Sequence, residues 1–541
     1  MVHLEKQTLA ELCLKAAKHY RKKVCFQVYR DDGVYNRLSY TDFGNKVRAF
    51  ASRLMQLGVK PGDRVMILAE NRPEWPVAYF GIILTGAINV PVLTDFTPQQ
   101  IGTIAVHAGI SALCCTERTF SKISEINLAI QVIRIDADMD HFSIPAEDQF
   151  PVINEDDPAS IIYTSGTTGN SKGILLSHRN LVFVAAGALK HMKIYSRDRL
   201  ISVIPLAHTY ECTLGMLTVV MSGASVSYLD KPPSPAILIP AMQTLRPTAI
   251  LTVPLFIEKI CRMKIFPEME KSRLYKFPLT RPLVRLLAGQ KLMATFGSAI
   301  RFFGIGGAPL AEDVELFLRK IGFPYSPGYG LSETAPLVSG ASPYKFPVRS
   351  CGYTLTGTEV RIGAINAGGI NTGGDNTGGQ KAEGEIQVKG PHVMLGYYRD
   401  EERTRAAFTE DGWFKTGDLG RLDKKGNLYI LGRLKTMILG PSGENIYPEE
   451  IESIINTSLL VEDSLVIPGE RGELVALIVL SEKAQTTIAA LGDSIEELKN
   501  SVNKKLAAFS RLNRIEIQKE PFEKTPTMKI KRFLYPRKQP G

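Results

Sequence analysis

Two hydrophobic periods alternate along the first part of the chain. Apolar residues recur every three or four positions after the capping pattern Thr8-x-x-Glu11, which predicts an amphipathic helix. Short continuous apolar runs, such as 64–69, are typical of buried strands. The pattern predicts further helices at about 41–57, 74–84 and 98–107, and strands at 64–69, 87–93 and 112–115. Strands that alternate with helices predict a parallel, doubly wound sheet.

The same alternation begins again after Ala159. Strands are expected at 160–163, 200–204, 224–229, 249–253 and 300–305, with helices between most of them. We therefore predict an α/β fold with two related sheet layers. In this fold a large N-terminal domain of doubly wound sheets, layered with helices, is joined by a small β-subdomain and a small mobile α+β C-terminal domain.

A low-complexity segment at 364–380 repeats Asn-(Ala/Thr)-Gly-Gly between strand-like runs at 359–362 and 384–388. Gly and Asn tolerate positive φ, so we expect an extended hairpin loop.

The chain changes character near Arg433. Helices at about 448–455 and 494–507 and strands at 463–467 and 474–480 form a compact α+β pattern. We place the domain boundary at 432–436. We expect an N-terminal domain at 1–432, a hinge at 433–436 and a C-terminal domain at 437–541.

Composition describes an ordinary globular protein. The 541 residues are 44% hydrophobic and 22% charged, which excludes collagen-like and disordered chains and predicts roughly three to four structural units. The seven cysteines include no CxxC pair, which favours a reducing compartment. No apolar run approaches the roughly 20 residues of a spanning helix, and the N-terminus has no apolar signal core. We expect a cytoplasmic protein.

The net charge of +10 is concentrated in two stretches, 259–301 and the tail after Glu523. Basic residues mixed with Phe, Leu and Tyr suit an anionic membrane surface or phosphorylated ligands, and a solvated basic face explains the same pattern equally well. We expect no nucleic-acid partner and weak peripheral association with the inner face of a membrane.

The motif YTSGTTGNSKG at Tyr163–Gly173 carries the strongest chemical signal. It follows an apolar strand, its glycines let the backbone fold around a phosphate, and its hydroxyls and amides can donate to phosphate oxygens. The spacing differs from the Walker loop GxxxxGK[ST]. The motif therefore predicts phosphate binding outside the P-loop NTPases.

This loop resembles the signature of the adenylate-forming (AMP-binding) superfamily, which includes acyl- and aryl-CoA ligases, nonribosomal adenylation domains and firefly luciferases. Further motifs match in the family's order across nearly the whole chain: PLAH (205–208), GGAPL (306–310), GYGLSET (328–334), GWFKTGDLG (412–420), GRLK (432–435), SGENIYPEEIE (442–452) and KTPTMKIKR (524–532). The segments 205–215 and 291–310 look most like those of long-chain fatty acid:CoA ligases, although Ile305 stands where those ligases usually have Ser.

The resemblance assigns nucleotide-binding roles to matched positions. The residues implied to hold ATP or AMP are Thr164, Ser165, Gly166, Thr167, Thr168, Gly169, Lys172, Gly306, Gly307, Ala308, Gly328, Tyr329, Gly330, Ser332, Asp418, Arg433 and Lys529. Within this set Tyr329 stacks on adenine, and Asp418 with Arg433 binds the ribose hydroxyls. Ser332 stands where the family usually has Thr, and it retains the hydroxyl that contacts the α-phosphate.

The resemblance also implies catalytic, metal and acceptor positions. The implied catalytic residues are Lys529, His208 and Lys172, the Mg²⁺ ligand is Glu333, the hinge residue is Lys435, and Gly443 lines the thiol tunnel. A carboxylate suits Mg²⁺ because this hard cation prefers oxygen ligands.

The identity of the catalytic lysine rests on the tail motif. The family usually reads PTGKIxR, whereas this chain reads PTMKIKR, with Met528 in place of Gly. Lys529 aligns with the family's lysine, and Lys524 and Lys531 are nearby competitors for the role.

The implied activity is that of an acid–thiol ligase. ATP converts a long-chain fatty acid into acyl-AMP and pyrophosphate, and the thiol of CoA then expels AMP. Two alternatives remain open. One is a fatty acyl-AMP ligase or acyl-acyl-carrier-protein synthetase with a protein-bound thiol, and the other is a non-catalytic lipid- or nucleotide-binding protein.

Overall fold

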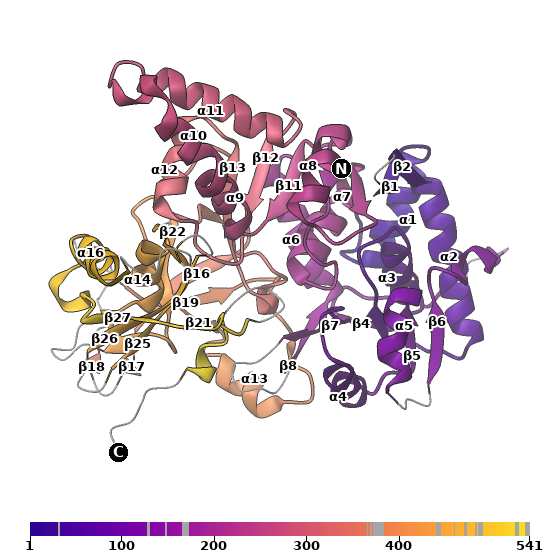
Figure 1. Ribbon diagram of the computed structural model, residues 1–541. Helices are drawn as coiled ribbons and strands as arrows, with labels where there is room; N and C mark the ends of the chain where they lie inside the picture. Colours follow the sequence, from indigo (N-terminus) through magenta and orange to yellow (C-terminus); the bar gives the residue numbers. More distant parts are fainter. Residues whose placement is uncertain are drawn as a thin grey trace.

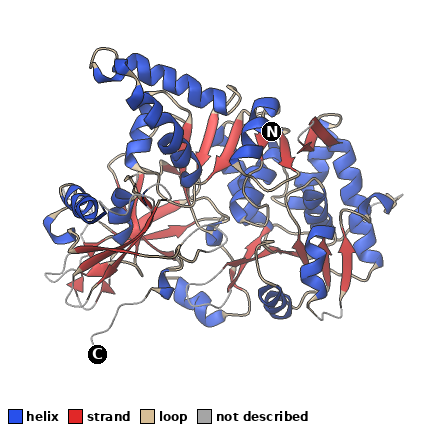
Figure 2. Cartoon of the chain, viewed as in Figure 1, coloured by secondary structure: helices blue, strands red, loops and turns tan. Residues whose placement is uncertain are grey.

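The computed structural model describes the chain apart from residues 31–32, 127–129, 146–148, 165–171, 365, 368–369, 372–382, 440–444, 459, 470–472, 482–483, 485–490, 525–529 and 536–541. The described strands form two large sheets and a smaller antiparallel sheet in the N-terminal part, and a separate small sheet in the C-terminal part (Figures 1 and 2). None of the described helices combines the length and the hydropathy needed to cross a membrane.

The seven-stranded sheet has the order β20-β8-β7-β4-β3-β5-β6. Its strands are β3 (Arg64–Leu68), β4 (Ile88–Pro91), β5 (Ala112–Cys115), β6 (Gln131–Arg134), β7 (Pro158–Thr164), β8 (Lys172–Ser177) and β20 (Gly396–Tyr397). The pairs among β3, β4, β5, β6 and β7 are parallel, and β8 pairs antiparallel with β7.

The nine-stranded sheet has the order β15-β14-β13-β12-β11-β9-β10-β1-β2. Its strands are β1 (Val24–Arg30), β2 (Gly33–Ser39), β9 (Arg199–Ile201), β10 (Ser225–Leu229), β11 (Ala249–Thr252), β12 (Phe302–Ile305), β13 (Tyr325–Tyr329), β14 (Ser339–Gly340) and β15 (Tyr353–Thr354). The predicted pair of sheet layers is confirmed, whereas the hairpin of β1 and β2 was missed. Of the residues of β2 only Leu38 is buried, so its sequence carries no clear hydrophobic alternation.

Both sheets are buried on both faces. In β3, Val65 and Ile67 belong to the core between the two sheets, whereas Met66 and Leu68 belong to the core on the outer face. This alternation explains why the strand reads as a continuous apolar run. Helices that contribute to the core between the sheets are α1 (Leu9–Tyr20), α2 (Tyr40–Gln56), α3 (Glu74–Leu84), α6 (His178–Met192) and α7 (Thr218–Ser222), with the π-helix η2 (Tyr210–Leu217).

Further helices cover the outer faces (Figure 1). The outer face of the seven-stranded sheet packs on α4 (Pro98–Ala108) and α5 (Glu117–Ser124). The outer face of the nine-stranded sheet packs on α8 (Pro235–Leu245), α9 (Pro254–Ile260), α10 (Phe266–Lys271), α11 (Arg281–Thr295) and α12 (Glu312–Lys320), with η3 (Cys261–Ile265) and η4 (Arg273–Lys276). The layers therefore run helix, sheet, helix, sheet, helix.

The predicted β-subdomain is a four-stranded antiparallel sheet in the order β16-β19-β21-β22, next to α13 (Glu401–Ala407). Its strands are β16 (Glu359–Gly363), β19 (Gly384–Lys389), β21 (Phe414–Leu422) and β22 (Leu428–Arg433). Of the predicted hairpin loop at 364–380, the structure describes a short antiparallel pair, β17 (Asn366–Ala367) and β18 (Ile370–Asn371). The rest of that loop lies outside the described residues.

The C-terminal part has its own core, as predicted for an α+β unit. Its sheet has the order β25-β26-β27, and a short pair β23-β24 precedes it. The elements are β23 (Ile438–Leu439), β24 (Asn445–Ile446), α14 (Pro448–Ile455), β25 (Val461–Pro468), β26 (Leu474–Leu480), α16 (Leu491–Asn503) and β27 (Arg514–Ile517).

Candidate active site

Two of the matched motifs begin at the same edge of the nine-stranded sheet. Strands β12 and β13 are parallel neighbours, with Ile305 opposite Pro327. The carboxyl ends of parallel strands meet at one edge, where ligands bind in open α/β sheets. GGAPL directly follows β12 and GYGLSET overlaps the end of β13, so the sheet brings together the residues implied to hold adenine and the α-phosphate.

Close backbone contacts explain two glycines of these motifs. A Cβ on Gly330 would lie 1.7 Å from the carbonyl oxygen of Pro336, so only glycine fits where the loop folds back on itself. A Cβ on Gly306 would lie 3.2 Å from the ring of Tyr210. Tyr210 comes from η2, two residues after His208, so the PLAH segment lies against the GGAPL segment.

Tyr329, Asp418 and Arg433 form one polar unit. The buried Tyr329 hydroxyl donates to Oδ2 of Asp418 at 2.9 Å, and Arg433 Nε lies 3.1 Å from Oδ1. Register explains the ion pair, because Asp418 on β21 lies opposite Arg433 on β22. Burial and the Asp418 carboxylate hold the pKa of Tyr329 well above its usual value, so the phenol remains a donor. The predicted adenine and ribose residues are therefore adjacent.

A second polar unit joins Lys172, Glu333 and Tyr397. Lys172 Nζ lies 2.5 Å from Oε1 of the buried Glu333, and the Tyr397 hydroxyl donates to the same oxygen at 3.1 Å. Lys172 also lies 4.8 Å from the centroid of the Tyr397 ring. The position of Lys172 follows from the β-hairpin, since it pairs with Thr164 across β7 and β8. The unit places a cation and a carboxylate beside the residues that flank the predicted phosphate loop in the chain, Thr164 and Lys172.

The chemistry of Glu333 fits the predicted Mg²⁺. Its Oε2 accepts no hydrogen bond from the described residues, which leaves one carboxylate oxygen for another ligand. Within the described part of the chain, no group of three or more His, Cys, Asp or Glu is placed to hold a metal ion. A Mg²⁺ held by one carboxylate takes its remaining ligands from phosphates and water, which is its usual mode in ATP sites.

The PLAH segment meets the GYGLSET segment through hydroxyl groups. Thr209 Oγ1 donates to Ser332 Oγ at 3.2 Å. The neighbouring His208 accepts a hydrogen bond from the backbone N–H of Tyr210 at Nδ1, over 3.2 Å. In the neutral ring the proton therefore sits on Nε2, which is then a donor. Ser332 and Glu333 are adjacent in the chain, so the residue after His208 lies against the neighbour of Glu333.

Several predicted residues lie outside the described part of the chain: Ser165, Gly166, Thr167, Thr168, Gly169, Gly443 and Lys529. Of the two competitors for the lysine role, Lys524 is paired with Asp463 at 2.5 Å and Lys531 with Glu523 at 3.1 Å. The predicted hinge residue Lys435 is exposed on the connection after β22.

Sequence analysis missed Tyr397, Asn71 and Glu211. Tyr397 pairs with Ile174 on β8 and reaches Glu333, but the sequence around it, LGYYRD, has no chemical signal of its own. Asn71 bonds Ser202, Ile204 and Leu206, more than 130 positions further along the chain, and the buried Glu211 accepts a hydrogen bond from Ser202.

The fold and the site define an α/β enzyme class whose nucleotide-binding motifs converge on one sheet edge. A model of the AMP-binding enzyme family matches residues 13–398, and a model of the AMP-binding enzyme C-terminal domain matches residues 435–535. The chain belongs to the AMP-binding enzyme family, which confirms the resemblance found in the motifs.

Individual relatives match the chain over most of its length at low sequence identity. The chain is 28% identical over 584 residues to a long-chain-fatty-acid–CoA ligase of Mycobacterium bovis, covering 95% of this chain and 93% of the relative. It is 28% identical over 516 residues to a 4-coumarate–CoA ligase of Petroselinum crispum, covering 90% and 86%.

Solved structures share the fold over nearly the whole chain. The ATP-bound MatB of Rhodopseudomonas palustris has a TM-score of 0.78 and 25% identity, covering 97% of this chain and 98% of its own. An o-succinylbenzoate CoA synthetase of Bacillus subtilis has a TM-score of 0.77 and 23% identity, covering 96% of each chain.

Proposed function

We propose that this chain is an AMP-forming acid–thiol ligase that converts a fatty acid to acyl-AMP and then transfers the acyl group to the thiol of CoA. The observation that carries this proposal is that one short segment, GYGLSET, supplies both polar units: Tyr329 bonds Asp418, which pairs with Arg433, and Glu333 pairs with Lys172. Ser332 lies between Tyr329 and Glu333 in the chain and bonds Thr209. This arrangement supports one bound nucleotide, with its ribose at Asp418 and its phosphates toward Lys172 and Glu333.

In the first step a carboxylate oxygen attacks the α-phosphorus. A new P–O bond forms, the bond between the α- and β-phosphates breaks, and pyrophosphate leaves. Lys172 would stabilise the negative charge on the phosphates. A Mg²⁺ held by Glu333 would neutralise further phosphate charge. His208 would donate from Nε2 to the incoming carboxylate, and the Ser332 hydroxyl would contact the α-phosphate.

In the second step the thiol of CoA attacks the acyl carbonyl. A C–S bond forms, the C–O bond to AMP breaks, AMP leaves and the thiol loses its proton. We propose that residues 433–436 act as a hinge about which the C-terminal domain (437–541) rotates between the two steps. Lys529 would serve the first step, and Gly443 would leave room for the thiol in the second.

The acid is proposed to be a long-chain fatty acid. Support comes from the segments 205–215 and 291–310 and from the long-chain ligases among the relatives, which also include 4-coumarate ligases. Each buried CH₂ contributes up to about 0.8 kcal/mol, so kcat/KM should rise with chain length until the acyl site is full.

An acyl-chain panel tests this function. AMP release is measured with acetate, benzoate, coumarate and saturated acids of increasing length, each with CoA or with holo-acyl carrier protein as the thiol. We expect activity to rise toward chains of about twelve carbons or more and to depend on CoA. A preference for acetate, benzoate or coumarate would overturn the fatty-acid assignment, and activity with the carrier protein alone would overturn CoA as acceptor.

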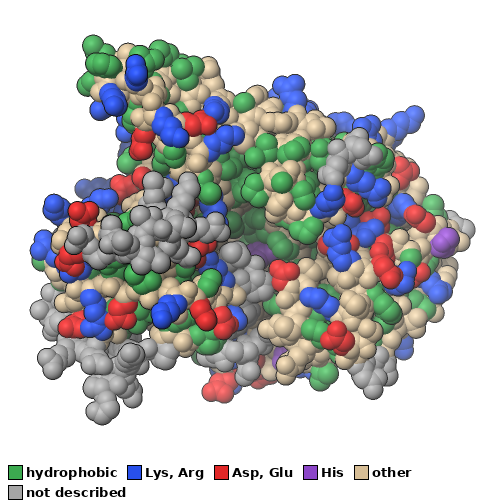
Figure 3. Space-filling view, viewed as in Figure 1, with side chains coloured by type: hydrophobic (Ala, Val, Ile, Leu, Met, Phe, Trp, Pro, Cys, Tyr) green, Lys and Arg blue, Asp and Glu red, His purple; other side chains and the backbone are tan. Residues whose placement is uncertain are grey.

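We also propose that the enzyme works in the cytoplasm and contacts anionic lipid at the inner face of a membrane, through the projection formed by η4 and α11. The inner side of α11 buries Val284 and Leu292, whereas leucines also occupy its solvent side. Exposed apolar residues of the projection are Leu274, Phe277, Leu279, Leu283, Leu286 and Leu287. Basic side chains lie among them, as Figure 3 shows over the α11 region.

Vesicle sedimentation tests the lipid contact. Each Lys or Arg near an anionic surface contributes about 1 kcal/mol, screened by salt. We expect binding to phosphatidylserine vesicles that falls with salt and with the variant Leu283→Asp. Lys15→Gln, at a lysine of α1 that is paired with Glu11 and lies outside both basic stretches, is the control and should leave binding unchanged. Equal binding to neutral vesicles would contradict the proposal.

A further inference from the structure

The loop after β3 reaches across to the segment that carries His208. Asn71 Nδ2 donates to Ser202 Oγ at 2.9 Å and to the carbonyl oxygen of Ile204 at 2.7 Å, and Oδ1 accepts from the backbone N–H of Leu206 at 2.7 Å. One amide side chain thus uses both its donor and its acceptor atoms on the residues just before His208. Because β3 and β9 belong to different sheets, these bonds join the two sheets at the site.

The other side of the His208 loop is tied to the same network. Ser202 Oγ donates to Oε1 of Glu211 at 2.5 Å, and both side chains are 3% exposed. Glu211 lies three residues after His208, in η2, where π-helical turns are frequent at functional sites. Asn71, Ser202 and Glu211 therefore hold the 202–211 loop at both ends.

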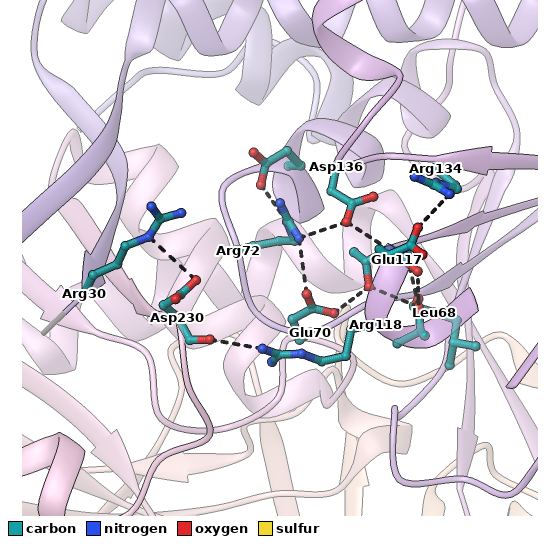
Figure 4. A network of polar contacts seen from close by, with 12 residues as sticks. Arg30, Leu68, Glu70, Arg72, Glu117, Arg118, Arg134, Asp136 and Asp230 are labelled. Carbon is teal, nitrogen blue, oxygen red and sulfur yellow. Dashed lines mark hydrogen bonds and ion pairs between the residues drawn. The ribbon is translucent and has the colours of Figure 1, made fainter. Parts of the chain in front are cut away.

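The loop that carries Asn71 is itself fixed by charge. The Arg72 guanidinium lies 2.8 Å from Glu74, 3.2 Å from Glu70 and 3.5 Å from Asp136 (Figure 4). Thr116 Oγ1 also donates to Glu70 at 2.7 Å. Glu70 after β3 and Asp136 after β6 thus meet at one arginine, and Thr116 after β5 holds Glu70. These contacts fix the loop that carries Asn71.

Burying a carboxylic acid costs free energy, so the presence of Glu211 in the core calls for an explanation. Replacing buried charged or polar networks by apolar side chains is often neutral or stabilising. Glu211 Oε2 has no hydrogen-bond partner among the described residues, and a Cβ on Gly215 would lie 2.7 Å from the carboxyl group. The network is therefore poorly explained by stability and well explained by the position that it gives to the loop.

We propose that Asn71 and Glu211 are positioning residues for the carboxylic acid: through the 202–211 loop they set the place of His208 and Thr209 relative to Ser332. The inference rests on the proposed function and adds two residues that touch neither nucleotide nor acid. Among the described residues, the loop meets the nucleotide side through Thr209, which bonds Ser332, and through Tyr210, which lies beside Gly306. The described hydrogen bonds of the network hold the loop and not the Tyr329–Asp418–Arg433 unit, so its loss should affect the acid far more than ATP.

Asn71→Ala tests the inference, with Asn89→Ala as the matched control. Asn89 is a buried asparagine on β4 whose amide donates to the backbone carbonyl oxygen of Tyr79 and, among the described residues, makes no hydrogen bond to 202–211. A displacement of about 1 Å can lower a rate about 100-fold. For Asn71→Ala we expect kcat/KM for the acid to fall about 10- to 100-fold in pyrophosphate exchange, while KM for ATP stays within about twofold. Asn89→Ala should lower thermal stability without this split.

Glu211 supplies a second test that separates position from folding. Glu211→Gln retains an oxygen that can accept from Ser202 and should keep most of the acid kcat/KM. Glu211→Leu should fold with an equal or higher Tm and still lose acid kcat/KM. An unchanged acid kcat/KM in Asn71→Ala or Glu211→Leu, or equal losses for acid and ATP, would overturn the inference alone. Absence of exchange in the wild type with every acid would overturn the proposed function and this inference with it.

Discussion

Glu211→Gln should remove a pH dependence of stability. Burial raises the pKa of the Glu211 carboxyl from 4.5 to about 8, and the hydrogen bond from Ser202 offsets only part of this effect. The acid is therefore neutral in the fold at pH 7 and ionised in the unfolded chain. A raised pKa in the folded state means that stability is fully present below pH 4.5 and is lost as the pH rises toward and through 8.

The size of the effect follows from these two pKa values. Between pH 7 and pH 9 the linkage relation gives a loss of about 1.4 kcal/mol from this one group. The neighbouring acids do not interfere, because burial raises the pKa of Cys212 to about 12 and holds the pKa of both Tyr210 and Tyr228 well above its usual value. A glutamine cannot ionise, so the variant should be spared this loss.

Urea unfolding at pH 6, 7, 8 and 9 measures the difference. We expect the stability of Glu211→Gln relative to wild type to rise by about 1.3 kcal/mol between pH 6 and pH 7 and by about 1.4 kcal/mol between pH 7 and pH 9, most of the latter below pH 8. Glu74→Gln, at a partly exposed carboxylate of the Arg72 cluster, is the control for general charge effects. A stability difference that does not change with pH would refute the reasoning, because it would mean that Glu211 does not titrate in this range.

Three further predictions concern the site. Tyr329→Phe removes a buried hydrogen bond to a carboxylate, worth about 1.5–3 kcal/mol, so KM for ATP should rise at least about 10-fold with little change in KM for the acid; equal changes in both would contradict the adjacency with Asp418. Gly330→Ala forces a Cβ against the Pro336 carbonyl, so Tm and AMP binding should both fall, and an unchanged Tm would contradict the contact. Lys529→Ala should slow acyl-AMP formation about 10²–10³-fold and leave thioester formation from supplied acyl-AMP unchanged. Gly443→Trp should leave acyl-AMP formation intact and abolish thioester formation. If Lys531→Ala showed the adenylation defect instead, Lys529 would be the wrong lysine.

Elements with a strong local signal were predicted well. The helix at 74–84 and the strands at 112–115 and 474–480 were found at their observed bounds, because apolar periods and flanking turns define them locally. The β1–β2 hairpin was missed, since its second strand buries a single residue, Leu38, and has no such period.

For the site, too, the sequence predicted the residues that stand in motifs and not the contacts that depend on the fold. Tyr329, Asp418 and Glu333 stand in motifs that the sequence shows directly. Their adjacency depends on strand register and sheet order, as in the pairing of Asp418 with Arg433, which local patterns do not specify. The contact of Asn71 with Ser202 spans 131 positions of the chain, and a single amide in a loop has no signature that would reveal it.

The central claim is that this site adenylates a carboxylic acid. Exchange of labelled pyrophosphate into ATP, measured with and without saturated fatty acids of increasing length, tests it most directly because it isolates the first step from the identity of the thiol. The account predicts Mg²⁺-dependent exchange that requires the acid, rises with chain length to about twelve carbons or more, and is lost in Asp418→Ala. Exchange that is absent with every acid, or that proceeds equally without one, would contradict it.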